Sequence, residues 1–493
     1  MTTKLLAIDL GSSHVHAAVS DLNGTQIGSA EYPLHLTPDS EGSDLAWTID
    51  PAILIKTVAS TAASALKNAL ASSNEIASIG ITGQRQGVAF LGQLKQDLLL
   101  SPNIDIRAAF EGLVLQEKFG TETKRITGHF PLVILAPSRL MWLRNHRPDL
   151  YSQLSSILTL PAWLVHKLTG VLFDEHTLSA ATGLLDISTL ERPFSLIDNM
   201  GIPRSILPPL ISSGEIGGQL TNEAAKFLNL RPGTPITLAG ADTQCGMLGM
   251  GLSSVGELGV VTGWSCSAQV ITGTPKYDSE SDAWIGCFPL ANRWVLEANL
   301  GDAGRAHRWL KDLFLNQDSS WQEADRLASE SKDSELQGTW TFLGPGPISA
   351  PAAGLHRGGL LFSTPLSYQV PDVGQLFQSF WENLCFSLKA NLSSICSEAP
   401  TLHLGGGMAR SRQLAQTLSN VLNTEVKRSK FPHVSAAGAC LAAGAAVGLV
   451  DSLHDAIQTY QPSWEQFQPE SNAVMKLEDR FEEWITLYQR LQD

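Results

Sequence analysis

Two aspartates stand at positions where a carboxylate can do chemistry. Asp9 follows a short apolar run at residues 4–8, and Asp242 follows a second apolar run that starts at residue 235. We expect each run to be a buried strand, so that each carboxylate lies at the carboxyl end of a strand, where α/β proteins place their ligands. Such a group can accept a proton or help to hold a cation. For Asp242 one alternative stays open, since Asp is also favoured at the N-cap of a helix.

Glycine and hydroxyl residues follow the first aspartate and recur in the middle of the chain. Residues 4–20 read as a strand, a turn and a returning strand, and residues 257–270 repeat this pattern. We interpret the two hairpins as copies of one unit, the second of which opens a second domain. N–H groups in a tight turn form an anion-binding concavity, so two facing tips would hold a polyphosphate; two ordinary surface hairpins are the alternative. The tips are Gly11, Ser12 and Ser13 in the first hairpin and Gly263, Trp264 and Ser265 in the second.

Two further polar clusters follow predicted strands in the first half of the chain. Gln84, Arg85 and Gln86 come directly after the apolar residues 76–81, so their side chains would reach the ligand edge of a sheet and bind hydroxyl groups. An arginine in a surface turn is an equally acceptable interpretation of this segment. Asp105 lies two residues before an arginine, which would make the pair strand neighbours on one face.

Small residues dominate the C-terminal half. A predicted strand at residues 401–404 leads into three glycines and a helix, a pattern that lets a nucleotide base or ribose lie on the backbone. Residues 435–449 are nearly all small, which predicts a helix packed closely against another element. Residues 374–395 carry apolar side chains at helical spacing and predict a core helix, and residues 474–491 predict a final amphipathic helix.

The length, composition and net charge of the chain limit the classes of protein to which it can belong. A chain of 493 residues with 43% hydrophobic content has room for two large domains and their cores. Its formal net charge of -14 argues against non-specific nucleic-acid binding. The six cysteines form no CxxC, no histidine pair has zinc-ligand spacing, and the cysteines are typical of reduced residues in a cytoplasmic protein. We find no run long enough for a membrane span and no signal peptide.

In order and spacing these pieces resemble the FGGY family of carbohydrate kinases. The resemblance runs from Ile8 to about Val450, and its strongest segments are IDLGSSHVHAAV, IGITGQRQG, LAGADTQCGMLGMG, LGGGMARSRQLAQTLSNVL and AAGACLAAGAAVG. It implies an α/β fold of two actin/hexokinase-like (ribonuclease H-like) domains that flank a catalytic cleft. We expect an N-terminal domain at residues 1–245, a C-terminal ATP-binding domain at 246–460, and a packed C-terminal helix within 461–493.

The resemblance also implies a function and a set of site residues. The expected enzyme is an ATP-dependent kinase that transfers the γ-phosphate to a hydroxyl of a small sugar, a ketose such as a pentulose, or a polyol. Asp242 matches the catalytic base, and Asp9 with Asp242 matches the Mg²⁺ site. The implied sugar contacts are Gln84, Arg85, Gln86, Asp105, Asp242 and Thr243. The implied ATP contacts are Gly11, Ser12, Ser13, Gly263, Trp264 and Ser265 at the phosphates and Gly406, Gly407 and Arg410 at the adenosine.

The chain departs from the family pattern at several positions. His16 stands where relatives often carry Lys or Arg, Trp264 replaces a hydroxyl residue, and His433 replaces an acid. These departures motivate a second hypothesis, a catalytically weak sugar- or nucleotide-sensing protein on the same fold. A dinucleotide oxidoreductase fits poorly, because no GxGxxG opens a helix after the first strand. For partners we expect a small sugar or polyol, no nucleic acid and no membrane, with a homodimer as an open alternative to a monomer.

Overall fold

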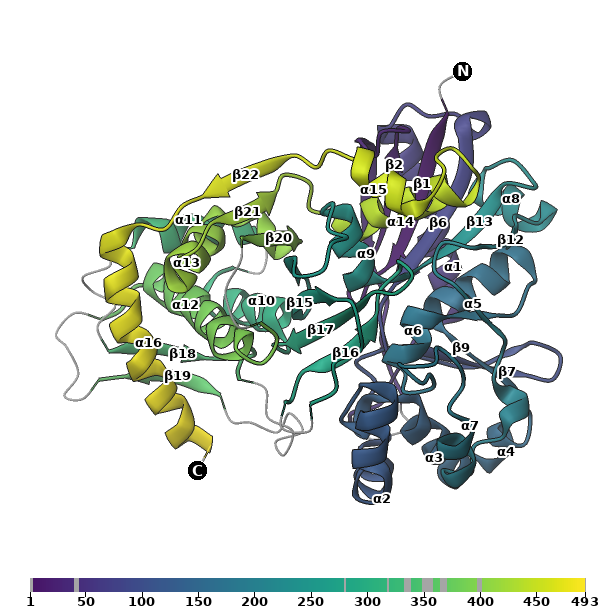
Figure 1. Ribbon diagram of the computed structural model, residues 1–493, viewed down its shortest axis with the longest axis horizontal. Helices are drawn as coiled ribbons and strands as arrows, with labels where there is room; N and C mark the ends of the chain where they lie inside the picture. The colour runs from purple at the N-terminus through teal and green to yellow at the C-terminus, as the bar shows by residue number, and fades with distance from the viewer. Residues whose placement is uncertain are drawn as a thin grey trace.

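Two main β-sheets, each covered by helices, make up the protein (Figure 1). The computed structural model describes residues 3–39, 44–278, 281–316, 319–331, 338–347, 358–363, 370–396 and 401–492. In Figure 1 the first sheet stands at the upper right, and the second sheet and its helices occupy the middle and left. The mixed α/β fold with two sheets confirms the predicted fold class.

The first sheet has six strands in the order β12-β13-β6-β1-β2-β3. The strands are β1 (Lys4–Leu10), β2 (His14–Ser20), β3 (Gln26–Pro33), β6 (Ile76–Gly83), β12 (Ile216–Gln219) and β13 (Pro235–Ala241). β1, β6 and β13 run parallel, whereas β2 and β3 run antiparallel to their neighbours. The carboxyl ends of the three parallel strands therefore meet at one edge, where Asp9 pairs with Thr82 in register and Asp242 begins the next helix.

The second sheet repeats this topology around its own hairpin. Its order is β16-β17-β15-β14-β20-β21-β22, and β14 pairs antiparallel with β15 and parallel with β20, as β1 pairs with β2 and β6. This repeat confirms the prediction that the two hairpins are copies of one unit. The strands are β14 (Leu258–Thr262), β15 (Cys266–Thr272), β16 (Trp284–Cys287), β17 (Trp294–Asn299), β20 (Leu402–Gly406), β21 (Val426–Ser429) and β22 (Trp464–Phe467).

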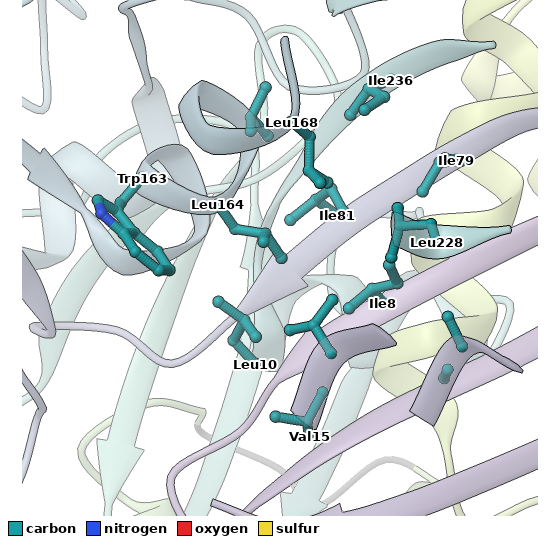
Figure 2. Packing of buried hydrophobic residues seen from close by; sticks show 14 of the residues in the cluster. Ile8, Leu10, Val15, Ile79, Ile81, Trp163, Leu164, Leu168, Leu228 and Ile236 are labelled. Atoms are coloured by element: carbon teal, nitrogen blue, oxygen red, sulfur yellow. The ribbon is translucent and has the colours of Figure 1, made fainter. Parts of the chain in front are cut away.

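The two faces of the first sheet have different covers. Side chains alternate along a strand, so Leu6, Ile8 and Leu10 of β1 point to one face, while Asp9 points to the other. The first face packs against α1 (Pro51–Asn68), α5 (Leu160–Thr169) and α8 (Asn222–Leu228) in a core of large aliphatic residues. Figure 2 shows Ile8 and Leu10 with Ile79, Ile81, Leu164 and Leu228 in this core.

The opposite face is covered by α14 (Val434–Ala446), a helix from the far end of the sequence. It packs on β1, β6 and β13 and crosses α9 (Asp242–Gly249), which follows β13. A Cβ atom on Gly249 would lie 1.9 Å from the Val434 carbonyl oxygen, and one on Gly438 would lie 1.9 Å from the Cys245 carbonyl oxygen. The crossing therefore requires glycine at both positions, which confirms the predicted close packing of the small-residue helix.

In the part of the chain that the structure describes, helices of the C-terminal half surround the second sheet. They are α10 (Ala303–Phe314), α11 (Trp321–Glu330), α12 (Val373–Leu392), α13 (Arg412–Leu422) and α16 (Ser471–Gln492). The apolar stripe of α12 is buried with Trp484 of α16, which confirms both predicted helices. The domain boundaries stay a prediction, but α14 falls by sequence in the predicted second domain and packs on the first sheet.

The remaining elements connect or extend the two sheets. They are β4 (Thr37–Pro38), β5 (Trp47–Thr48), β7 (Val88–Gly92), β8 (Asp97–Ser101), β9 (Leu154–Thr159), β10 (Asp174–Glu175), β11 (Leu210–Ile211), β18 (Thr339–Phe342), β19 (Gly359–Phe362), α2 (Ala109–Thr127), α3 (Ala136–His146), α4 (Pro148–Tyr151), α6 (His176–Ala181), α7 (Phe194–Asn199) and α15 (Leu453–Thr459). Asp105 and Arg107 were predicted as strand neighbours; they lie instead in the loop between β8 and α2. Among the described residues, no helix combines the length and the apolar character that crossing a membrane requires.

Candidate active site

A cavity of about 510 Å³ opens between the two sheets, at the edge where the parallel strands end. Both hairpin tips line it, as do the start of α9 and the turn after β20. Many of the residues predicted from the sequence contribute to its wall: Asp9, Gly11, Ser12, Ser13, Asp242, Thr243, Gly263, Trp264, Ser265, Gly406, Gly407 and Arg410. These residues come from distant parts of the chain, and the repeated topology of the two sheets brings them together.

Asp9 and Asp242 lie on the same wall of this cavity. Asp9 is nearly buried, whereas the Asp242 side chain keeps 24% of its surface exposed. The capping alternative for Asp242 is wrong, because the N-cap of α9 is Ala241 and Asp242 is the first helical residue. Its Oδ1 accepts a hydrogen bond from the N–H of the next residue, Thr243, at 2.8 Å. Among the described residues no hydrogen bond involves the second carboxylate oxygen, which is therefore left for other partners.

Burial and proximity change the acidity of both carboxyl groups. Removal from water raises the pKa of Asp242 to about 7, an effect that Arg85 opposes and the neighbouring Asp9 reinforces. Burial also raises the pKa of Asp9, and His16 opposes this rise. The two groups interact and therefore titrate as a pair. A carboxylate whose pKa lies near neutrality is suited to accept a proton from a hydroxyl group.

Arg85 links Asp242 to the second sheet. Its guanidinium binds Glu297 of β17 with two hydrogen bonds, at 2.5 and 2.8 Å, and both side chains are buried. Arg85 Nε lies 3.9 Å from Asp242 Oδ1. Burial alone would raise the pKa of Glu297, but Arg85 outweighs this effect and lowers it. Glu297 was not predicted; its signal was a single charged residue inside an otherwise apolar strand, which is rare without a partner.

The other predicted sugar-contact residues lie beneath the cavity wall and do not line it. Gln84 is buried; its Nε2 donates to the Gly11 carbonyl oxygen at 3.1 Å, and its Oε1 accepts from the Asn103 N–H at 2.8 Å. Asp105 is fully buried and accepts a hydrogen bond from Arg107 Nε at 2.7 Å. The contacts of Gln84 hold the first hairpin tip against the turn after β8.

Gln86 differs from these two. It has a φ of 60°, a backbone conformation that few residues other than glycine adopt, and its side-chain Nε2 is buried without a hydrogen-bond partner among the described residues. An unsatisfied buried donor of this kind is free to bind a ligand.

Two glycines leave open space on the cavity side. A Cβ atom on Gly263 or Gly407 would meet nothing within 4 Å, so a ligand can approach the backbone closely at both. Gly406 differs, because its φ of 98° and a Cβ position only 2.0 Å from the Thr262 carbonyl oxygen both require glycine. Trp264 lines the cavity with its indole Nε1 buried and unpaired among the described residues, and the Arg305 guanidinium lies 5.7 Å from its ring.

Comparison with known proteins decides the family. The model of the FGGY family of carbohydrate kinases, N-terminal domain, matches residues 4–249, and that of the C-terminal domain matches residues 258–447. The chain belongs to the FGGY family of carbohydrate kinases. The autoinducer-2 kinase of Escherichia coli (strain K12) is 26% identical over 505 residues, covering 98% of this chain and 94% of the relative.

Solved structures agree in fold. Gluconate kinase from Lactobacillus acidophilus superimposes with a TM-score of 0.84 at 18% identity, covering 100% of this chain and 98% of that chain. The ligand-bound xylulose kinase from the same organism has a TM-score of 0.83 at 18% identity, covering 99% of this chain and 98% of that chain. As an FGGY carbohydrate kinase, the protein is an ATP-dependent phosphotransferase.

Basic side chains that were not predicted from the sequence also line the cavity of this FGGY kinase. Arg308 and Lys311, both on α10, line it together with the predicted Arg410. Phosphoryl transfer depends on neutralising phosphate charge, so a helix with basic residues soon after the second hairpin was the available signal. His16 and His433, two positions at which the chain departs from the family pattern, also line the cavity, and their ring centroids lie 4.9 Å apart.

The donor set of this FGGY kinase fits a hydrated Mg²⁺. Oδ1 of Asp9 is buried and has no hydrogen-bond partner among the described residues, although its carboxylate faces the cavity. An unpaired buried carboxylate oxygen is costly unless a cation or water satisfies it. Mg²⁺ prefers oxygen ligands and usually keeps several waters, so Asp9 and Asp242 offer suitable chemistry.

Proposed function

We propose that this kinase transfers the γ-phosphoryl group of ATP to a hydroxyl of a small sugar, a ketose such as a pentulose, or a polyol. Asp242 serves as the general base. The observation that supports this most strongly is that Asp9 and Asp242 share one cavity with both glycine-containing hairpin tips. Such transfer needs charge neutralisation and positioning more than covalent chemistry, and this cavity offers both.

Asp242 accepts the proton of the attacking hydroxyl, and Arg85 supports it in that role. With Nε at 3.9 Å from Asp242 Oδ1, Arg85 favours the ionised carboxylate and limits its movement. The buried pair with Glu297 holds the guanidinium in place. Asp9 and Asp242 would hold Mg²⁺, which neutralises phosphate charge when bound.

The two hairpin tips bind the phosphates of ATP through backbone N–H groups and hydroxyls. Arg308 and Lys311 add positive charge on the α10 side of the cavity. Gly406, Gly407 and Arg410 form the adenosine site, where open space at Gly407 allows the base or ribose to lie on the backbone. Because these contacts use mainly backbone groups, Trp264 in place of a hydroxyl residue is compatible with transfer.

The sugar lies on the Asp242 side of the cavity. We assign Asp242 and Thr243 to direct contact with it, since both line the cavity. Arg85 acts from behind Asp242, and the side-chain amide of Gln86, buried behind the same wall and unpaired among the described residues, remains available to a bound sugar. Gln84 and Asp105 act as positioning residues, because both are buried and satisfied by protein groups. The predicted role of Asp105 in sugar binding thereby becomes indirect.

A substrate panel with ADP release as the readout tests the proposal. The panel holds pentuloses, hexuloses, glycerol, gluconate and autoinducer-2, the last because autoinducer-2 kinases are 26% identical over 98% of the chain. We expect one small hydroxylated compound to stimulate ADP release. Asp242→Ala should lower kcat by about 10²- to 10⁴-fold, as loss of a general base does, while the exposed control Asp451→Ala keeps wild-type turnover.

Saturable sugar binding without turnover in the wild type would overturn catalysis and support the sensing alternative. Wild-type turnover in Asp242→Ala would overturn the assignment of the base. The cytoplasmic location and the homodimer stay predictions, and size-exclusion chromatography with light scattering measures the oligomeric state.

A further inference from the structure

Three potential metal ligands meet in the cavity, apart from the two aspartates. His16, Glu31 and His433 each offer one ligand atom, and these atoms all lie within 4.8 Å of one another. All three side chains line the cavity, and none belongs to the predicted Mg²⁺ site. Two of them, His16 and His433, are positions at which the chain departs from the family pattern.

The sheet register explains why His16 and Glu31 are neighbours. Asp9 of β1 pairs with His16 of β2, and His16 pairs with Glu31 of β3, so the three side chains form a row on one face. α14 covers the same face. His433 directly precedes α14 and thereby reaches His16 from the other side, with the ring centroids 4.9 Å apart.

We propose that His16, Glu31 and His433 form a binding site for a transition-metal dication, with Zn²⁺ as the best fit. Two imidazole nitrogens and one carboxylate oxygen are a known three-ligand set for zinc, in which the fourth position is left to water or a substrate. Nitrogen ligands favour Zn²⁺, Co²⁺ or Ni²⁺ over Mg²⁺, which prefers oxygen. The site is thus chemically distinct from the Asp9 and Asp242 pair.

The observed spacing is close to what coordination requires. Tetrahedral ligands about 2.1 Å from zinc lie about 3.4 Å apart, so the present atoms need to move inward by only about 1 Å. His16 and His433 are partly buried and Glu31 is exposed, which leaves a path for an ion to enter. Side-chain rotations of this size need no change in the backbone.

The present contact between His16 and Glu31 is consistent with the same assignment. Nδ1 of His16 lies 3.2 Å from Glu31 Oε2, within ion-pair distance, so two of the three ligand atoms already face each other. A cation bound at this site would be shared by both atoms. The competing cation, Arg410, approaches Glu31 Oε2 only to 3.9 Å, too far for a hydrogen bond.

Titration of the metal-stripped full-length chain with Zn²⁺, by calorimetry and without nucleotide, tests the site. Co²⁺ serves as a spectroscopic probe, because its visible absorption reports a low-coordinate site with nitrogen ligands. We expect one tight Zn²⁺ per chain that excess Mg²⁺ does not displace. His433→Ala and Glu31→Gln should each weaken binding by more than about tenfold, on the scale of disturbed metal shells.

The matched control is His454→Ala, which removes an exposed histidine on α15 away from the cluster. This variant should bind Zn²⁺ and Co²⁺ as the wild type does. Glu31→Gln keeps the side-chain shape at an exposed position, so it decides the matter if His433→Ala fails to fold. Equal affinity in wild type and Glu31→Gln, or no Zn²⁺ binding at all, would overturn the proposal whether or not the kinase reaction is confirmed.

Discussion

Replacement of Asp242 by Asn should lower kcat by about 10²- to 10⁴-fold and make the protein more stable at alkaline pH. The folded protein raises the pKa of this carboxyl from 3.8 to about 7. As pH rises above 4, the carboxyl ionises in the unfolded chain first, so unfolding becomes more favourable until the folded pKa is passed. At about 1.4 kcal/mol per pKa unit, the cost to the folded state reaches about 4 kcal/mol at pH 8 and is about 2 kcal/mol at pH 5.

Asn carries no charge at any pH and can still accept the hydrogen bond from the Thr243 N–H, so the variant lacks this cost. With an unfolding entropy of about 1 kcal/mol per degree for a chain of this length, Tm should rise by about 4 °C at pH 8 and by about 2 °C at pH 5. Differential scanning fluorimetry at both pH values measures the shift, and ADP release measures the loss of turnover.

The exposed Asp451→Asn is the matched control and should leave Tm unchanged at both pH values. A variant at position 242 that is no more stable than wild type at pH 8 would refute the reasoning. So would a gain in Tm of the same size at pH 5 and pH 8, because the stabilisation would then be unrelated to ionisation.

Three further predictions follow from the site and its support. The kcat/KM for the sugar should rise with pH through about 7, because Asp242 must be ionised to accept a proton; initial rates from pH 5 to 9 measure this, and a flat profile contradicts it. Arg85→Met should lower the free energy of unfolding by about 3–5 kcal/mol, since it leaves Glu297 buried without its partner. The double variant Arg85→Met, Glu297→Met should regain much of this free energy in urea titrations, and an additive loss in the double variant argues against the pair. Gly438→Ala should cost about 3 kcal/mol of stability by forcing α14 off α9, whereas Gly407→Ala should keep the wild-type Tm and raise KM for ATP; equal Tm values for the two variants would contradict this.

The elements with a strong local pattern could be predicted from the sequence. The strand that ends at Asp9, its Gly/Ser turn and the repeat around Thr262 are short and regular, so their pairing follows from neighbouring residues. The small-residue helix was predicted to pack closely, but its partner was not. Its contact with the first sheet joins segments hundreds of residues apart, and composition carries no information about that choice.

The residues of the candidate site likewise divide into those that could be predicted from the sequence and those that could not. Asp9 and Asp242 could be predicted because each ends a buried strand, and the structure places both in one cavity. Glu297 was missed because its role depends on Arg85, which lies in the loop after β6, a strand of the other sheet. No spacing rule along the chain could group His16 with His433, since sheet register and the position of α14 bring them together.

The position of α14 has a consequence for synthesis on the ribosome. The strands of the first sheet are complete once β13 has emerged, yet the helix that covers one face of that sheet is translated about 200 residues later. At about 5–20 residues per second, this face waits about 10–40 seconds for its cover. During that interval the nascent chain exposes Leu5, Ala7 and Ala239 to water, and chaperones that bind unfinished proteins can recognise this apolar surface. Any fragment that ends before residue 434 would expose it permanently.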